Sequence, residues 1–157
     1  MNTAGGGCTE ESMVGCAGST PDRRIVKFIR RHHVLTLSTC HDSESWCANI
    51  FYAYIPERNL FVYTTDPKTR HGREGAQNPQ VSASIVLETK VVGNIRGLQI
   101  AGRVRLTDNA DEFARKAYLK RFPYAAATKL ELWILEPAYM KFTDNTLGFS
   151  RKLLWKK

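Results

Sequence analysis

The segment from Leu60 to Val81, LFVYTTDPKTRHGREGAQNPQV, carries the side chains of this sequence best suited to holding an anion. An apolar, strand-like run ends in the hydroxyls of Thr64 and Thr65, and a polar, helix-like run closed by Asn78-Pro79 follows. Between them stands a short basic stretch made of Lys68, Thr69, Arg70 and His71. A helix start favours an anion through its free N–H groups and its dipole, and Lys and Arg add charge-assisted hydrogen bonds. The segment predicts a phosphate site, although a solvated basic helix after a strand explains it too.

The sequence contains no clear motif for nucleotide binding, acid–base catalysis or metal binding. Neither GxGxxG nor GxxxxGK[ST] occurs, so the usual nucleotide fingerprints are absent. No Ser/His/Asp order, carboxylate pair or metal cluster stands out, so no catalytic residue and no metal ligand are assigned. The four cysteines form no CxxC, which favours reduced thiols in a cytoplasmic protein, and Cys40 and Cys47 are expected to be buried and inert.

Composition and charge narrow the class of protein. A chain of 157 residues that is 43% hydrophobic fits one folded domain. No apolar run approaches the roughly 18 residues of a membrane span, and no secretory signal is recognisable. A net charge of +8 suits nucleic acid, an anionic membrane or a phosphorylated ligand. The charge is dispersed and lacks the aromatic interleaving of RNA platforms, so a nucleic-acid-binding barrel is retained only as an alternative.

The order of predicted elements indicates a small barrel. Met1 to Ser19 is rich in Gly, Ser and Thr and is interpreted as a disordered leader, which leaves residues 20–157 as the domain. Thr20-Pro21-Asp22 opens a helix that ends near His32. Two further helices are expected at Pro67–Gln77 and Asp108–Phe122. Strands are expected at Val34–Thr39, Trp46–Ile55, Leu60–Thr65, Val81–Leu87, Asn94–Leu106, Leu130–Leu135 and Tyr139–Thr143.

Two features of these strands favour closure of the sheet into a barrel. Gly97 and Gly102 lie inside the long strand, where glycine indicates a bulge, a tight bend or the close approach of a ligand. Glu136-Pro137 is read as a hinge between the last two strands. Together the elements predict a mainly β, α+β fold: a six-stranded antiparallel split β-barrel with peripheral helices.

Three segments in this order resemble a known family: FVYTTDPKTRHGREGAQNPQVSASIV, IRGLQIAGRVRLTD and LWILEPAYMKFTDNTLG. They are similar to the strand with its "YT" end and phosphate clamp, the long central strand, and the "W-x-L-x-P" ending of the pyridoxamine 5′-phosphate oxidase-like FMN-binding split barrels. WCANIFYAY, KTRH and ARKAYLKRFP look closer still to an uncharacterised bacterial branch, the YhbP-like proteins. The likeness runs from about Ile25 to the C-terminus.

The resemblance implies a homodimer with FMN in two clefts between the subunits. The strand from Trp46 to Phe51 would run under the isoalloxazine ring, with backbone groups of Ala48 and Asn49 reading its polar edge. Trp46 would stack on the flavin or plug the barrel mouth, and His71 would donate to the flavin or lie on a helix surface. The phosphate side would be lined by Tyr63, Thr64, Thr65, Lys68, Thr69 and Arg70. Gln99 of the partner subunit, Thr143 and Asn145 would also reach the flavin.

The sequence departs from pyridoxamine phosphate oxidases where those enzymes hold their substrate. Their strand begins with an Arg, whereas this one begins Trp46-Cys47-Ala48-Asn49, and their C-terminal Arg/His pair is replaced by Asn145, Phe149 and Arg151. The expected function is an FMN-dependent oxidoreductase acting on a different small molecule, with a nicotinamide coenzyme as electron source. A non-catalytic flavin- or haem-binding module is the second reading.

Overall fold

The computed structural model describes residues 13–17, 20–108, 111–147 and 152–157. The helices are α1 (Arg23–Arg31), α2 (Arg70–Gln77) and α3 (Glu112–Arg121), with short 3-10 turns at Val92–Asn94, Pro123–Ala127 and Asn145–Leu147. The strands are β1 (Met13–Ala17), β2 (Val34–His41), β3 (Glu44–Ile55), β4 (Leu60–Thr64), β5 (Gln80–Val86), β6 (Arg96–Leu106), β7 (Leu132–Asp144) and β8 (Lys152–Lys156). No helix in these ranges is long and apolar enough to span a membrane.

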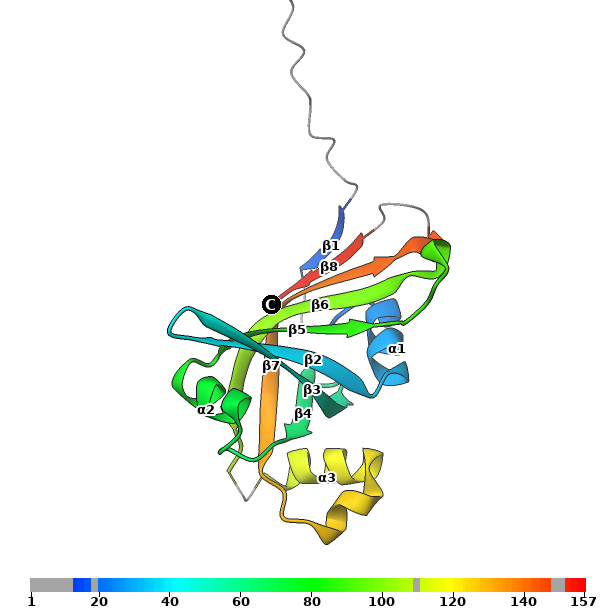
Figure 1. Ribbon diagram of the computed structural model, residues 1–157. Helices are drawn as coiled ribbons and strands as arrows, with labels where there is room; N and C mark the ends of the chain where they lie inside the picture. The colour runs from blue at the N-terminus through cyan, green and yellow to red at the C-terminus, as the bar shows by residue number, and fades with distance from the viewer. Residues whose placement is uncertain (1–12, 18–19, 109–110, 148–151) are drawn as a thin grey trace, which may run out of the picture.

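Six of the described strands close into an antiparallel barrel. Hydrogen-bonded neighbours follow the order β7-β4-β3-β2-β5-β6, and β6 pairs again with β7 to complete the ring. Figure 1 shows the three helices at the periphery of this barrel. The six-stranded split barrel predicted from the sequence is therefore confirmed.

The strand β7 is continuous, which corrects the expected pair of strands hinged at Glu136-Pro137. Its first half pairs with β4 and its second half with β8, while β6 pairs along its whole length. The register against β6 shifts between Ala101 and Gly102, whose partners are Tyr139 and Pro137. The ladder is interrupted where the proline lies, so its missing N–H is tolerated and the strand bends instead of ending.

Both ends of the chain contribute strands that composition did not reveal. Lys152–Lys156 in the polar tail pairs antiparallel with β7, and Met13–Ala17 pairs in parallel with Lys152–Lys156. The expected leader therefore contains a strand, and the rest of it lies outside the described residues. Leu153 and Trp155 of β8 are buried in the barrel core, and β1 pairs through its backbone with the edge that β8 leaves.

Local boundaries follow the capping and turn residues. Asp22, rather than Thr20, caps α1 by accepting the N–H of Arg24. Asp42 and Ser43 have φ of 50° and 64°, which allows a tight turn and extends β2 and β3 beyond the expected ends. Thr69 caps α2, which begins at Arg70 and not at Pro67.

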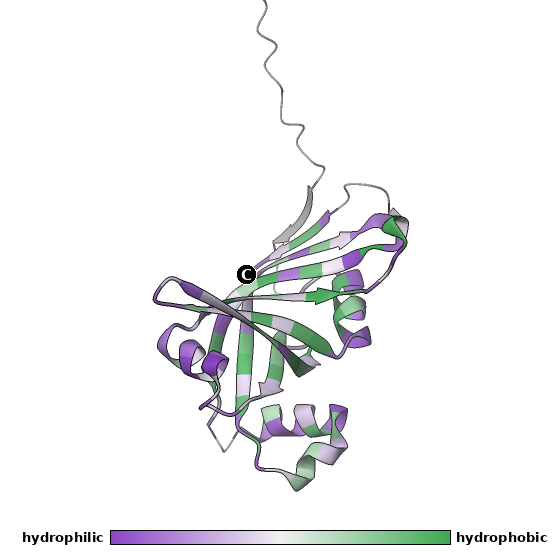
Figure 2. Ribbon diagram, in the orientation of Figure 1, coloured by the Kyte–Doolittle hydropathy of each residue, from purple (hydrophilic) through white to green (hydrophobic). Residues whose placement is uncertain are grey.

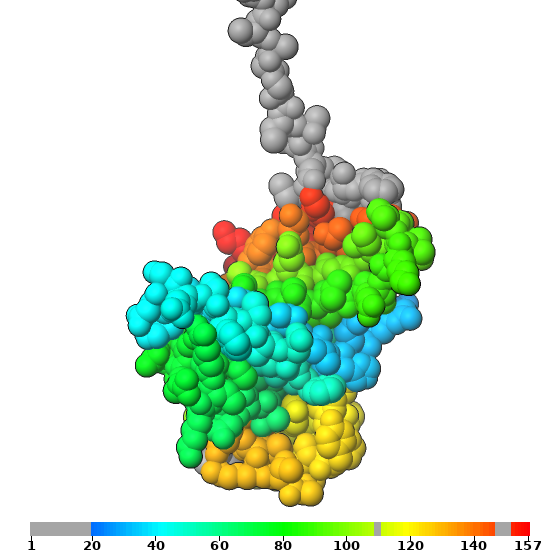
Figure 3. Space-filling view, viewed as in Figure 1, coloured from blue at the N-terminus to red at the C-terminus, as the bar shows by residue number. Residues whose placement is uncertain are grey.

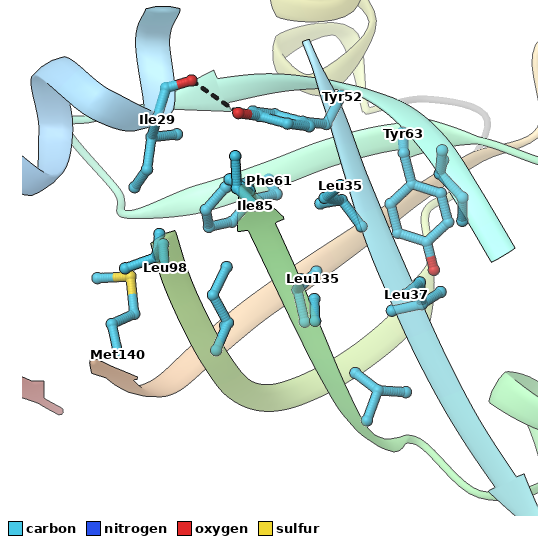
Figure 4. Packing of buried hydrophobic residues seen from close by; sticks show 14 of the residues in the cluster. Ile29, Leu35, Leu37, Tyr52, Phe61, Tyr63, Ile85, Leu98, Leu135 and Met140 are labelled. Atoms are coloured by element: carbon cyan, nitrogen blue, oxygen red, sulfur yellow. Dashed lines mark hydrogen bonds between the residues drawn. The ribbon is translucent and has the colours of Figure 1, made fainter. Parts of the chain in front are cut away.

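Two apolar clusters hold the fold together. The larger one fills the barrel, and α1 closes one end with Ile25, Phe28 and Ile29. Figure 4 shows the barrel residues converging and the Tyr52 hydroxyl donating to the Ile29 carbonyl oxygen at 2.7 Å. The second cluster lies outside the barrel, where α3 covers β3, β4 and β7 through Ala53, Ile55, Val62, Ala114, Tyr118, Phe122, Leu132 and Ile134. In Figure 2, α3 carries a mixed rather than a fully apolar surface, consistent with a helix that covers one face.

A buried carboxylate attaches α2 to the barrel. Glu74 accepts hydrogen bonds from Thr39 Oγ1 at 2.5 Å and from Arg70 Nε at 2.6 Å. These bonds, that from Thr39 first, lower the pKa of the Glu74 carboxyl and keep it ionised. Asn78 Nδ2 adds a bond to the Cys40 carbonyl oxygen. The first turn of α2 is thereby held against the β2–β3 hairpin.

We expect Gly102→Ala to destabilise the fold and Gly97→Ala to leave it nearly unchanged. A methyl group on Gly102 would overlap the Glu136 carbonyl and lie 3.1 Å from Pro137 Cα, whereas on Gly97 its nearest neighbour is 3.7 Å away. Overpacking against backbone costs roughly 1–3 kcal/mol. Urea unfolding of both variants at one protein concentration measures the difference. Equal stabilities would contradict the close approach at the β7 bulge.

We expect Glu74→Gln to destabilise the protein at neutral pH and progressively less in acid. The folded-state pKa of Glu74 lies below its ordinary value of 4.5, so its stabilisation is present above that value and is lost as pH falls through the folded pKa. Unfolding free energies between pH 7 and 3 give the comparison. Glu88→Gln, which removes an exposed carboxylate after β5, is the matched control. A wild-type-minus-variant difference independent of pH would be the contrary result.

Candidate functional site

The candidate site begins at an unpaired edge of β3. β3 pairs with β2 from Glu44 to Phe51, but with β4 only from Tyr52 to Ile55. On the β4 side, the backbone from Glu44 to Phe51 therefore has no strand partner among the described residues. Figure 3 shows this hairpin projecting above α2. A strand edge offers alternating N–H donors and C=O acceptors to a ligand.

The register decides which backbone groups face that edge. Tyr52 N donates to the His33 carbonyl oxygen, so residues at even positions of β3 pair toward β2. The backbone of Ala48 thus faces β2, which differs from the expected contact with a ligand, while that of Asn49 faces the open edge. Phe51, a predicted site residue, and Cys47, which lies within the predicted strand from Trp46 to Phe51, also present their backbone groups there. The sequence did not fix the hairpin register that decides this orientation.

Three polar side chains meet at the start of α2: Thr65, Thr69 and His71. Thr65 Oγ1 lies 2.6 Å from His71 Nε2 and 3.3 Å from Thr69 Oγ1. Thr69 Oγ1 in turn accepts the N–H of Gly72 and donates to the Asp66 carbonyl oxygen. Burial lowers the pKa of His71, so its ring is neutral near pH 7. The ring forms one hydrogen bond with the Thr65 hydroxyl, and its tautomer decides which group donates. The structure brings these residues together as the sequence predicted.

Arg70 joins the hairpin to this turn. Its Nη2 donates to Glu44 at 2.9 Å and its Nε to Glu74 at 2.6 Å, and the guanidinium lies 4.7 Å above the Trp46 ring. The hydrogen bond to Glu74, then that to Glu44, raises the pKa of Arg70. Trp46 is 44% exposed. The Arg70 guanidinium therefore already pairs with two carboxylates. A bound anion would either add a third contact to the guanidinium or displace the exposed Glu44 side chain.

A pocket of about 410 Å³ lies on the other side of the same turn. Its lining comprises Thr64, Thr65, Asp66, Pro67 and Lys68, together with Lys129 and Glu131. Lys129 pairs with Glu131 at 2.6 Å, whereas Lys68 has no ion pair within the described ranges. Lys129 lies in a polar loop far along the chain, so no spacing rule could have connected it with Lys68.

Four other predicted residues lie elsewhere. The Tyr63 ring is 2% exposed and stacks on Trp133 inside the barrel, so it offers no side-chain surface to a ligand. Gln99 lies on the outer face of β6 opposite Ser84, Thr143 lies opposite Gly97, and Asn145 Nδ2 donates to the Val92 carbonyl oxygen. These three belong to the opposite end of β6 from Val104, where α2 packs. One chain does not bring them to the first turn of α2.

The outer face of β2, β3, β5 and β6 is uncovered in this chain. Cross-strand register places small polar residues at its centre: Thr36, Ser38, Asn49, Ser82, Ser84 and Gln99. Val34, Phe51 and Val86 are exposed apolar residues on it, at 39%, 52% and 67%. Cys47 is exposed and Cys40 half-buried on the same face, which corrects the expectation that both thiols are buried. No group of three potential metal-binding side chains occurs in the ranges that the structure describes.

Comparison with known proteins places the fold and the sequence in one family. Residues 21–144 match the family model described as Pyridoxamine 5′-phosphate oxidase. A UPF0306 protein of Photorhabdus laumondii is 40% identical over 134 residues, 85% of this chain and 94% of that protein. The UPF0306 protein YhbP of Escherichia coli O157:H7 is 37% identical over 132 residues, 83% of this chain and 90% of the relative.

Solved structures share the architecture at low identity. A heme binding protein from Mycobacterium smegmatis aligns with a TM-score of 0.69 at 19% identity, covering 82% of this chain and 55% of that one. A FAD-binding protein from Mesorhizobium loti aligns with a TM-score of 0.60 at 15% identity, covering 72% and 85%. At these identities the likeness concerns the fold. With the family match spanning the barrel, and relatives similar over most of their length, the chain belongs to the pyridoxamine 5′-phosphate oxidase family and to its UPF0306 group.

Proposed function

We propose that this protein is an FMN-binding oxidoreductase that holds the flavin between the open edge of β3 and the first turn of α2. The observation that carries the proposal is the unpaired backbone of Cys47, Asn49 and Phe51 beside a helix start. The polar edge of a flavin ring needs both donors and acceptors, and a strand edge supplies them in alternation. The flavin supplies the redox chemistry, and this chain supplies binding and orientation.

The phosphate end is supported by the charges around α2. Lys68 is exposed without an ion pair in the described part of the chain, and it lies two residues before the first turn of α2, where Thr69 Oγ1 takes up the N–H of Gly72. The Glu44 side chain is 74% exposed, so it returns to water at little cost when a phosphate takes its place on Arg70. His71 and Thr65 add a neutral donor–acceptor pair beside the site.

A second copy of the chain completes the proposed site. The outer face of β2, β3, β5 and β6 is the part of the barrel that α3 does not cover, and it exposes Val34, Phe51 and Val86. A two-fold dimer through this face is self-complementary. Such a dimer offers a route for Gln99, Thr143 and Asn145 of one copy to reach the cleft of the other.

The substrate is a small molecule other than pyridoxamine phosphate, and a nicotinamide coenzyme is the electron donor. The support is the character of the cleft rim, where Phe51 packs edge-on against Phe122 with centroids 5.7 Å apart. Aromatic carbon therefore borders the open edge of β3 at Phe51. Steady-state oxidation of NADH or NADPH by the flavin-loaded protein separates an enzyme from a module that only holds FMN.

A haem-binding function is the second candidate, since one structural neighbour is a heme binding protein. The absorbance spectrum of the purified protein distinguishes the two. Oxidised flavin gives two visible bands and a yellow colour, whereas haem gives an intense Soret band. A spectrum with neither, after incubation with each cofactor, would count against both.

Replacing Lys68 or Arg70 by Ala should weaken FMN by about 10- to 100-fold and leave riboflavin nearly unchanged. Charge-assisted hydrogen bonds to phosphate contribute roughly 1.5–3 kcal/mol each, and riboflavin lacks the phosphate. Flavin-fluorescence titrations with both ligands make the measurement. Glu44→Gln is the matched control: it frees Arg70 from one carboxylate and should bind FMN at least as tightly as wild type. Equal losses of affinity for FMN and riboflavin would contradict phosphate binding at the first turn of α2.

Ser84→Arg should convert a dimer into a monomer and lower FMN affinity, because it places an unpaired charge at the centre of the outer face. Light scattering at micromolar concentration gives the mass, and circular dichroism checks the fold. Ala127→Arg, at an exposed position after α3, should stay dimeric. A monomeric wild-type protein that binds FMN would refute the shared cleft.

A further inference from the structure

A second groove lies at the opposite edge of β3. The pairing with β2 ends at Val34 and Phe51, with one further bond from Tyr52 N to the His33 carbonyl oxygen. Beyond it, the β2 side of β3 has no strand partner among the described residues. A cavity of about 360 Å³ occupies this place, between the C-terminal end of α1 and one face of α3.

The groove is lined by more cations than anions. Arg30 of α1 and Lys120 and Arg121 of α3 face it, with Glu57 as the carboxylate. Neither Arg30 nor Lys120 forms an ion pair within the described ranges. With a neutral histidine the lining carries a net charge of two positive, which complements a dianion.

The carbonyl groups at the end of α1 would ordinarily repel an anion. Here Arg121 Nη2 donates to the carbonyl oxygens of Arg30 and His32, at 3.1 Å each. This bond satisfies two carbonyl groups that the helix end leaves free. The positive charge of Arg121 thereby offsets part of the negative potential at the C-terminal end of α1.

His32 is a lining residue of the groove whose imidazole Nε2 is shielded from solvent. Its Nε2 is buried and has no hydrogen-bond partner in the part of the chain that the structure describes, while its ring packs 4.3 Å from that of Phe28. A buried polar atom without a partner is unfavourable. Burial, then the charge of Arg31, lowers the pKa of His32, so the neutral ring can donate or accept one hydrogen bond.

The remaining wall is apolar. Phe113 and Ala117 come from α3 and Ile55 from β3. Phe113 is 43% exposed, and the Arg58 guanidinium lies 4.0 Å from its ring centroid, which holds the ring in place. Small-molecule sites commonly combine such an apolar wall with a few converging polar groups.

We propose that this groove binds a small phosphate monoester, with the phosphate between Arg30 and Lys120 and the organic part against Phe113. The site is separate from the proposed flavin cleft, because the two occupy opposite edges of β3. The proposal therefore does not depend on flavin binding.

Phenyl phosphate, titrated calorimetrically into the full-length protein, is the probe. Arg30→Ala and Lys120→Ala should each weaken it by about tenfold, as expected for the loss of one charge-assisted contact. Arg31→Ala and Lys116→Ala remove the same charges from the same helices outside the groove lining and should not change affinity. The His32 imidazole resonances should shift on binding in wild type, which reports the site directly.

Three outcomes of the phenyl phosphate titrations would overturn the proposal. The first is no binding of phenyl phosphate at millimolar concentration. The second is an equal loss in all four variants, which assigns binding to the general basic surface. The third is loss in Lys68→Ala with Arg30→Ala unaffected, which assigns the phosphate to the cleft at α2. Inorganic phosphate and benzyl alcohol should each bind more weakly than phenyl phosphate, and either one binding equally well would contradict a monoester site.

Discussion

The partial pairing of β3 is the constraint on which the rest of this structure depends. β3 has twelve residues, and each neighbouring strand covers only part of it. β2 takes the first part on one side and β4 the last part on the other. Each uncovered stretch leaves backbone donors and acceptors that must find water, a helix end or a ligand. The candidate flavin cleft and the basic groove are the two places where this occurs.

The position of α2 follows from a polar contact as well as from packing. Gly75 lies close against Val104, where a methyl group would come within 3.1 Å, but Glu74 connects the helix to Thr39 and Arg70. A buried carboxylate with two hydrogen-bond donors is costly to break and specific in geometry. The same Arg70 reaches the hairpin tip through Glu44 and covers Trp46. The Arg70 guanidinium thus both stabilises the position of α2 and provides a positive charge that an anion could use.

The helices share the barrel surface unequally, which bears on assembly. α1 closes one end and α3 covers the outer side of β3, β4 and β7. The outer side of β2, β5, β6 and the first part of β3 remains open, with small polar residues bordered by Val34, Phe51 and Val86. An exposed sheet face of this composition is suited to another sheet face of the same shape. The proposed dimer interface and the proposed cofactor site therefore share the same open sheet face.

Much of the fold could be read from the residues. Alternating apolar positions located β2, β3, β5 and β6, because alternation is a local property, whereas the start of α2 was expected at Pro67 and lies at Arg70. The hydroxyls and cations around Lys68 lie together for the same reason, since they are neighbours in the chain. The glycine within β6 indicated a close approach, and Gly102 indeed faces the backbone of Glu136.

What the sequence by itself determined is therefore local: most of the helices and strands, and the polar turn before α2. Tertiary structure alone decided the rest. Tyr63 lies on a strand buried on both faces, so alternation could not show that its ring packs on Trp133. Lys129, and the carboxylate of Glu44 on Arg70, come from segments far from the residues they meet, and only barrel closure brings them there. The strand β1 depends on the edge left by β8, because backbone pairing carries almost no signature in side-chain pattern.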